Sequence, residues 1–208
     1  MKKILLADDH SIVRSGVRSL IEDNFLERQV DEAETEDEIV RHLKATDYDL
    51  VVLDINIPNT DFTRLMNWIS VAAPGVKVLV FSMHPEDIYG NRCLQMGAKG
   101  YLHKTATNAE ILMAIRRILD GKKYISQHLA EILSDSDPDK KRDNPFNNLS
   151  AREMEMIKHL NDGKSLPEIC TILKIQYSTA NTFKRRIFEK LQVDSVLSLS
   201  RLMKSFEM

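Results

Sequence analysis

Cysteine is scarce in this chain, and long apolar runs are absent. The two cysteines, Cys93 and Cys170, lie far apart and at no metal-ligand spacing, which excludes a disulfide framework and a cysteine-based zinc site. No apolar run approaches the roughly 20 residues that span a bilayer. The apolar stretch after Met1 meets Asp8 and Asp9 too early for a signal peptide. These absences predict a cytoplasmic protein that makes no membrane contact.

The composition is that of a soluble globular protein, with 43% hydrophobic and 29% charged residues. A length of 208 residues suits one large domain or two small ones. The net charge of −2 is unevenly spread, because residues 1–133 hold 20 acidic and 16 basic residues, whereas residues 148–208 hold 7 acidic and 10 basic ones. The basic back half indicates contact with a polyanion.

Residues 1–121 alternate between short apolar runs and amphipathic segments with helical spacing. Strict alternation of strand and helix indicates a doubly wound α/β domain, in which helices cover both faces of a five-stranded parallel sheet. The predicted strands are 4–7, 30–34, 50–54, 76–82 and 99–104.

Four of these apolar runs end in reactive side chains. Because parallel strands bring their carboxyl ends to one edge of the sheet, we expect these side chains to share a crevice. Three carboxylates there would repel one another unless a cation joined them, and Mg²⁺ prefers such oxygen ligands. A hydroxyl and an ammonium could then hold the oxygens of a phosphoryl group attached to one carboxylate. The residues are Asp8, Asp9, Asp54, Ser82 and Lys104.

The character of the chain changes after residue 121. Residues 122–147 are predicted to form a linker that is partly helical and then polar, since Ser134 to Pro145 contains no apolar residue. No strand pattern follows, so residues 148–208 are predicted to form a small all-α domain. Capping boxes are predicted at Ser150 and Ser165. The predicted helices are 151–160, 167–173, 178–190 and 196–205.

The third of these helices combines an apolar stripe with a polar, basic surface. Phe183, Ile187 and Leu191 share the stripe and are expected to face the core. Small polar and basic residues elsewhere suit a helix in the DNA major groove, where Asn and Arg read base edges and Lys, Arg and Thr hold phosphates. Seen alone, the helix fits a solvated basic surface better, so its context has to decide.

The front half resembles the receiver domain of bacterial two-component response regulators. The resemblance lies in Ile4–His10, Leu53–Pro58, Phe81–His84 and Gly97–Lys104. It implies the flavodoxin-like strand order 2-1-3-4-5. It also implies that Asp54 accepts phosphate from a sensor histidine kinase. The further roles that it implies are Mg²⁺ ligands at Asp9, Asp54 and the Asn56 backbone carbonyl, a water-mediated Mg²⁺ contact from Asp8, phosphoryl contacts from Ser82 and Lys104, and an aromatic switch at Tyr101.

The back half resembles the LuxR-type helix-turn-helix domain, through Leu149–Glu153, Gly163–Ser165, Glu168–Cys170 and Lys190–Val193. A receiver, a linker and this domain, in that order, are similar to the NarL/FixJ subfamily of transcriptional regulators. The resemblance implies a phosphorylation-controlled regulator that binds double-stranded DNA and forms a homodimer when phosphorylated, with RNA polymerase as a candidate further partner. It places Asn181, Thr182 and Arg185 toward bases, and Thr179, Lys184, Arg186 and Lys190 toward phosphates.

Several positions depart from the family patterns. Phe62 stands where receivers usually have glycine, which brings the path of the loop after Asp54 into question. Met83 occupies a position where small residues are common, and we expect it to slow the access of water to the phosphoryl group. In the helix-turn-helix domain, Gln176 replaces a common capping Ser, Ala180 a common Val, and Asn181 a common Lys.

Two alternatives remain open at this point. One is a DNA-binding regulator that acts without phosphorylation. The other is a magnesium-dependent phosphatase, although such enzymes usually carry a second acid two residues after the nucleophile, where this chain has Asn56. The main hypothesis expects no enzymatic activity beyond the chain's own phosphoryl transfer and dephosphorylation.

Overall fold

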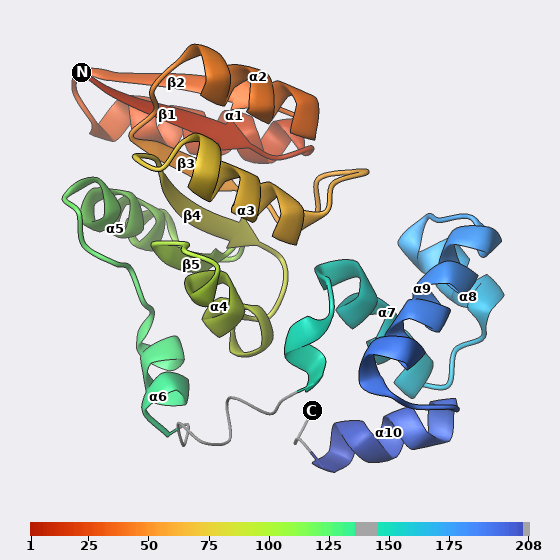
Figure 1. Ribbon diagram of the computed structural model, residues 1–208. Coiled ribbons are helices and arrows are strands. Elements are labelled where there is room, and N and C mark those ends of the chain that lie inside the picture. The colour runs from red at the N-terminus through yellow and green to blue at the C-terminus, as the bar shows by residue number, and fades with distance from the viewer. Residues whose placement is uncertain (136–144, 206–208) are drawn as a thin grey trace. The chain divides into compact units, whose positions relative to one another are not determined.

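A computed structural model describes residues 1–135 and 145–205 of the chain (Figure 1). The chain divides into two compact units, residues 1–135 and residues 136–208. Among the helices of the described ranges, none has the length and apolar character that crossing a membrane requires.

The first unit is a five-stranded sheet in which every strand pairing is parallel. The order β2-β1-β3-β4-β5 confirms the predicted doubly wound fold. The strands are β1 Lys2–Ala7, β2 Arg28–Ala33, β3 Leu50–Leu53, β4 Lys77–Ser82 and β5 Gly100–His103. The helices are α1 Ser11–Asn24, α2 Glu36–Ala45, α3 Phe62–Ala72, α4 Glu86–Gln95, α5 Asn108–Leu119 and α6 Gln127–Asp135.

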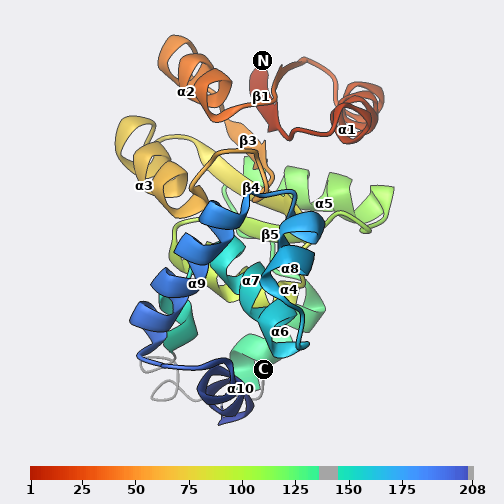
Figure 2. The same ribbon diagram turned by 90° about the vertical axis from the view of Figure 1, so that its right-hand side faces the viewer.

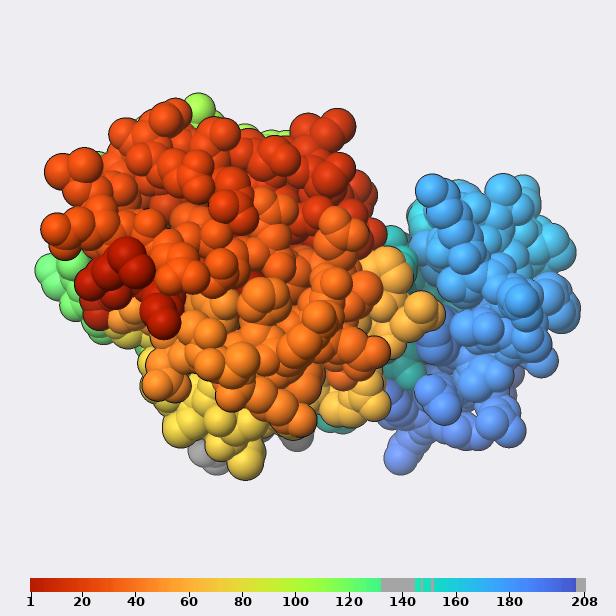
Figure 3. Space-filling model, turned by 90° about the horizontal axis from the view of Figure 1, so that it is seen from above, coloured from red at the N-terminus to blue at the C-terminus, as the bar shows by residue number. Residues whose placement is uncertain are grey.

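Helices cover both faces of this sheet. Figure 2 shows α1 and α5 on one side of the strands and α2 and α3 on the other. Alternate strand residues therefore point into two apolar layers, and Leu6 and Val52 lie in the layer that α1 and α5 close. All four residues of β3 are buried, as expected for a central strand. In the space-filling view the side chains of the red and orange segments form a continuous surface (Figure 3).

The loop after β3 makes its left-handed turn at Asn59, where φ is 58°. Asn tolerates this conformation better than most residues. Phe62 instead opens α3, with Asp61 as the N-cap, and its ring is buried. The positive φ of this loop therefore lies at Asn59, three residues before the position where receiver domains usually have glycine, and the Phe62 side chain packs in the core.

The predicted linker begins with ordered structure that belongs to the first unit. Tyr124 forms a parallel bridge to Gly100 on β5, and α6 then packs on α4. A Cβ atom built on Gly90 would lie 2.9 Å from a methyl group of Leu129, so a larger residue at position 90 would force the Leu129 side chain to shift. Most of the polar segment predicted between Ser134 and Pro145 lies outside the described residues.

The described part of the second unit contains helices and no strands, as predicted. The helices are η1 Pro145–Asn148, α7 Ala151–Asn161, α8 Leu166–Leu173, α9 Tyr177–Leu191 and α10 Val196–Ser205. Both predicted capping boxes are present, at Ser150 with Glu153 and at Ser165 with Glu168. The helices enclose a small apolar core that includes Ile157, Ile169, Ile187 and Leu199.

Candidate functional site: an acidic pocket and a basic helix

The carboxyl ends of β1, β3 and β5 place two acids around one ammonium group. Asp54 follows β3, and its backbone N–H donates to Ala7 of β1 at 2.8 Å, so Asp8 and Asp54 lie on adjacent strands. Lys104 Nζ lies 2.6 Å from Asp8 Oδ2 and 2.9 Å from Asp54 Oδ2. Burial by itself would lower the pKa of Lys104, but its hydrogen bonds and charge attraction to the two carboxylates outweigh burial and raise it. The ammonium therefore stays charged between two buried carboxylates.

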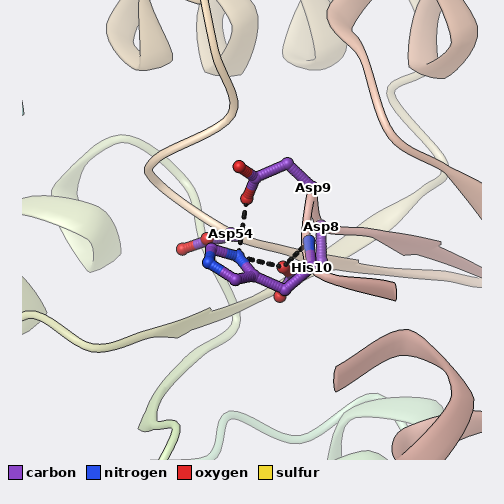
Figure 4. Close-up of side chains that lie close together, drawn as sticks. All are labelled: Asp8, Asp9, His10 and Asp54. Carbon is purple, nitrogen blue, oxygen red and sulfur yellow. Dashed lines mark hydrogen bonds and ion pairs between the residues drawn. The ribbon is translucent and has the colours of Figure 1, made fainter. Parts of the chain in front are cut away.

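A second set of contacts joins the acids on the open side of this pocket. Figure 4 shows the His10 imidazole between Asp9 and Asp8, close to Asp54. His10 Nδ1 lies 2.8 Å from Asp9 Oδ1 and 3.2 Å from Asp8 Oδ1. One ligand atom from each of these four residues lies within 4.8 Å of the others. The sequence interpretation left His10 out of the pocket, although its place directly after Asp8 and Asp9 was a usable signal.

Asp54 keeps one oxygen unused. Its Oδ2 accepts from Lys104, whereas Oδ1 is buried and has no hydrogen-bond partner among the described residues. A buried carboxylate oxygen without a partner is costly, so such an atom calls for an explanation. A group of three carboxylates, one of which has an oxygen without a hydrogen-bond partner, suits a hard divalent cation such as Mg²⁺. The chemistry of the pocket residues therefore fits the cation that the sequence implied.

Ser82 and Tyr101 are linked through His84. Tyr101 is fully buried, and its hydroxyl donates to the His84 carbonyl oxygen at 2.7 Å. Burial raises the pKa of Tyr101 above its ordinary value, so this donor keeps its proton. The His84 N–H in turn donates to Ser82 Oγ at 3.3 Å. One residue of the β4–α4 loop thus contacts both the predicted phosphoryl-binding hydroxyl and the predicted switch.

His84 is buried between the pocket and α4, although it lies in a loop. Its side chain is buried, stacks on Tyr89 with ring centroids 4.4 Å apart, and forms a 3.0 Å hydrogen bond between Nε2 and Asn56 Oδ1. His84 therefore joins the loop after β3 to the loop after β4. The sequence offered only its position two residues after Ser82 as a signal.

In the second unit, α9 turns its apolar side inward and a polar surface outward. Ala180, Ile187 and Leu191 are buried, whereas Phe183 is only half-buried, so the predicted stripe is shifted slightly. Asn181 and Arg185, predicted to face bases, are exposed. Thr182, the third residue of that set, is half-buried, and its hydroxyl donates to the Ser178 carbonyl oxygen at 2.9 Å. This surface is free of the unit's own core.

The residues predicted to hold phosphates are in more varied positions. Arg186 is exposed, Thr179 is half-buried, and the Lys184 ammonium lies 5.4 Å from the centre of the Phe188 ring. Lys190 donates to Glu153 Oε2 at 2.7 Å, and Glu153 is buried. Lys190 therefore already has a buried counterion that ties α9 to α7.

The amino terminus of α9 is open. Its N-cap, Gln176, makes no side-chain cap hydrogen bond, and the first turn contains no acidic residue. Free N–H groups and the positive end of the helix dipole favour an anion at such a terminus. The missing capping Ser therefore leaves backbone donors available for a phosphate.

Comparisons with known proteins divide the chain in the same way. Residues 4–116 match the response regulator receiver domain, and residues 147–203 match the bacterial regulatory proteins of the luxR family. Response regulator UvrY of Escherichia coli strain K12 is 31% identical over 204 residues, which cover 97% of this chain and 93% of UvrY. Response regulator GacA of Pseudomonas aeruginosa strain PAO1 is 30% identical over 203 residues, covering 97% of this chain and 95% of GacA.

Solved structures show the same fold. RcsB of Salmonella typhimurium aligns with a TM-score of 0.62 at 21% identity, covering 98% of this chain and 100% of that one. RcsB of Salmonella enterica serovar Typhimurium, bound to promoter P1flhDC in the presence of the phosphomimetic BeF3−, aligns with a TM-score of 0.60 at 22% identity, covering 99% of this chain and 98% of that one.

Proposed function

This chain belongs to the response regulators of two-component systems, with a receiver domain followed by a LuxR-type DNA-binding domain, and from that premise we propose that phosphorylation of Asp54 controls how α9 binds DNA. The observation that carries the proposal is the unpartnered, buried Oδ1 of Asp54 beside the charged Lys104. An acyl phosphate on Asp54 would replace the single carboxylate charge with a group that carries about −1.5 to −2. Lys104 and Ser82 would then hold its oxygens.

The pocket residues have separable roles in this transfer. The Asp54 carboxylate attacks phosphorus as the bond from phosphorus to the kinase histidine, or to the acetate of acetyl phosphate, breaks and that group leaves, while Lys104 keeps the carboxylate oriented through Oδ2. Asp9, Asp54 and the Asn56 backbone carbonyl, with Asp8 acting through a bound water, would hold Mg²⁺, which supplies charge neutralisation for the phosphoryl oxygens when it is bound. His10 would have to leave the Asp9 oxygen, and its side chain is 63% exposed, so it has room to move.

Ser82, His84 and Tyr101 give the signal a route away from the pocket. If Ser82 turns toward the phosphoryl group, its hydrogen bond from the His84 N–H breaks, and the β4–α4 loop, whose His84 carbonyl accepts from the Tyr101 hydroxyl, would shift. That loop leads directly into α4, on which α6 packs through Leu129 and through a 2.7 Å hydrogen bond from Ser126 Oγ to Glu86 Oε2. Since α6 ends the first unit, a shift of α4 would reach the carboxyl-terminal end of that unit.

The DNA-binding surface is the exposed part of α9 with Asn181 and Arg185 toward bases. Solved RcsB structures are described as dimers bound to DNA. We propose that this chain likewise binds two half-sites as a homodimer when phosphorylated. A sensor histidine kinase would be the phosphodonor and RNA polymerase a further partner, with the protein acting in the cytoplasm.

The phosphatase alternative receives no support from the pocket. The position where a second acid is needed holds Asn56, whose side-chain oxygen is hydrogen-bonded to His84. We propose that the chain catalyses only its own phosphoryl transfer and dephosphorylation. Regulation without phosphorylation would be indicated if Asp54 took no label from acetyl phosphate in the presence of MgCl₂.

The proposed function is tested by selecting DNA from a random pool with and without acetyl phosphate and MgCl₂. We expect one sequence family to be enriched, and to be enriched more strongly with the phosphodonor. Arg185→Ala should then weaken binding to the selected site by about tenfold, since a base-reading Arg contributes about 1–3 kcal/mol. Arg201→Ala, which removes the same charge from an exposed position on α10, serves as the control. Equal selection with and without phosphodonor would contradict the proposal.

Met83 provides a separate test of how the pocket controls the lifetime of the phosphorylated state. It follows Ser82 directly in the sequence and is 59% exposed. We expect Met83→Ala to admit water more readily and to speed the loss of label from the phosphorylated protein several-fold. If Met83→Ala lost its label at the same rate as the wild-type protein, Met83 would not shield the acyl phosphate from water.

A further inference from the structure

A buried arginine lies beside the acidic pocket. Arg14, on α1, is only 5% exposed, a rare position for this residue type unless its donors are used. Its Nη1 donates to the backbone carbonyl oxygen of Asp8 at 2.7 Å, and its Nε donates to Glu32 Oε2 at 3.0 Å. Its Nη2 pairs with Glu34. The guanidinium is therefore held in place by β2 on one side and by the loop after β1 on the other.

The hydrogen bond to Asp8 fixes the peptide plane that leads to Asp9. The Asp8 N–H donates to the Ala33 carbonyl oxygen at 3.1 Å, so both backbone polar groups of Asp8 are held. Since the Asp8 carbonyl and the Asp9 N–H lie in one rigid plane, the orientation of that carbonyl determines where the Asp9 side chain begins. Arg14 thus acts on the two acids that β1 supplies to the pocket without contacting either carboxylate itself.

We propose that Arg14 is a positioning residue for the divalent cation at the phosphoacceptor site. The proposal rests on the proposed function of that site. Glu32 and Glu34 complete the arrangement, because they pair with Nε and Nη2 of Arg14 and draw its positive charge away from the pocket carboxylates. Arg14 would then orient Asp9 without occupying the position of the cation.

Arg18 provides a matched comparison on the same helix. Its Nε donates to the other oxygen of Glu32 at 2.5 Å, and its second ion pair in the described residues is with Glu22. Arg14→Met and Arg18→Met therefore each remove one positive charge that is paired with Glu32. Only the first removes the hydrogen bond to Asp8.

A role for Arg14 through its charge and a role through its hydrogen bond to Asp8 predict opposite effects of these substitutions on Mg²⁺ affinity. Loss of a positive charge near the pocket strengthens the binding of a cation, whereas loss of an orienting hydrogen bond weakens it. Removal of a residue that orients a metal ligand typically costs 10–100-fold in metal affinity. We therefore expect Arg14→Met to bind Mg²⁺ about tenfold more weakly than the wild-type protein, and Arg18→Met to bind it equally or more tightly.

The measurement is a calorimetric titration of the full-length chain with MgCl₂, alongside urea unfolding without Mg²⁺. Labelling by acetyl phosphate adds a second readout, in which the Mg²⁺ concentration for half-maximal rate rises in Arg14→Met while the maximal rate changes little. Mg²⁺ binding by Arg14→Met as tight as that by Arg18→Met would overturn the proposal. A wild-type protein that neither binds Mg²⁺ nor takes label would instead overturn the proposed function.

A second variant keeps the test valid if Arg14→Met does not unfold cooperatively. Arg14→Lys keeps a buried positive charge, but a single ammonium cannot bind Asp8, Glu32 and Glu34 in the planar geometry of a guanidinium. Weaker Mg²⁺ binding by Arg14→Lys than by the wild-type protein supports the positioning role. Wild-type affinity would show that the charge alone is needed and would overturn the role.

Discussion

Asp54→Asn is expected to abolish the magnesium-dependent labelling of this protein by radiolabelled acetyl phosphate. An amide of the same shape cannot form the acyl phosphate, because it lacks the carboxylate nucleophile. The fold should be kept, since Lys104 retains its 2.6 Å pair with Asp8 and one of two mutually repelling buried carboxylates is removed. Labelling is measured on the full-length chain after gel separation, and urea unfolding checks that stability is equal or higher.

Asp47→Asn is the matched control for this experiment. Asp47 is exposed and lies before β3, at the opposite end of the strand from Asp54, so its variant should take label as the wild-type protein does. DNA binding gives a second readout, because the affinity of Asp54→Asn for the selected site should no longer respond to acetyl phosphate. Labelling of Asp54→Asn at the wild-type level would refute the assignment of the acceptor.

Glu153→Gln is expected to destabilise the DNA-binding unit by about 2 kcal/mol. Glu153 Oε2 accepts from the Ser150 N–H and from Lys190 Nζ, each at 2.7 Å, and the side chain is only 3% exposed. The change removes the charge of a capping box and leaves Lys190 without its counterion. The loss should stay below that of a fully buried ion pair, which is about 3–5 kcal/mol, because Lys190 is itself 39% exposed.

The second capping box of the same unit isolates this effect. Glu168 occupies the same place in α8, accepting from the Ser165 N–H at 2.7 Å, but it is exposed. Glu168→Gln should therefore change stability only slightly. Amide hydrogen exchange across residues 151–161 and 166–173 of the full-length chain measures both effects locally. Equal effects of the two substitutions would mean that the Lys190 pair contributes nothing beyond the cap.

Local pattern was enough to predict the class of fold of each unit, whereas the strand order of the sheet was implied by the resemblance to receiver domains. The alternation of apolar runs with helical spacing predicted all five described strands, and the capping boxes at Ser150 and Ser165 were readable as residue types at fixed spacing, but the short helix η1 was not predicted. The pocket was predictable for the same reason. Asp8, Asp54 and Lys104 each end an apolar run, and parallel pairing brings such ends together whatever the packing elsewhere.

Only the tertiary structure decided how these residues are held. Arg14 reaches the Asp8 carbonyl, His84 bonds Asn56, and Lys190 bonds Glu153 across 37 positions of the chain. None of these pairs follows from periodicity, because a long side chain on a helix or loop can turn toward solvent or toward several neighbours, and packing selects one. Spacing along the chain determines which surface of an element is buried, whereas the partner of a buried polar group depends on which distant element arrives beside it.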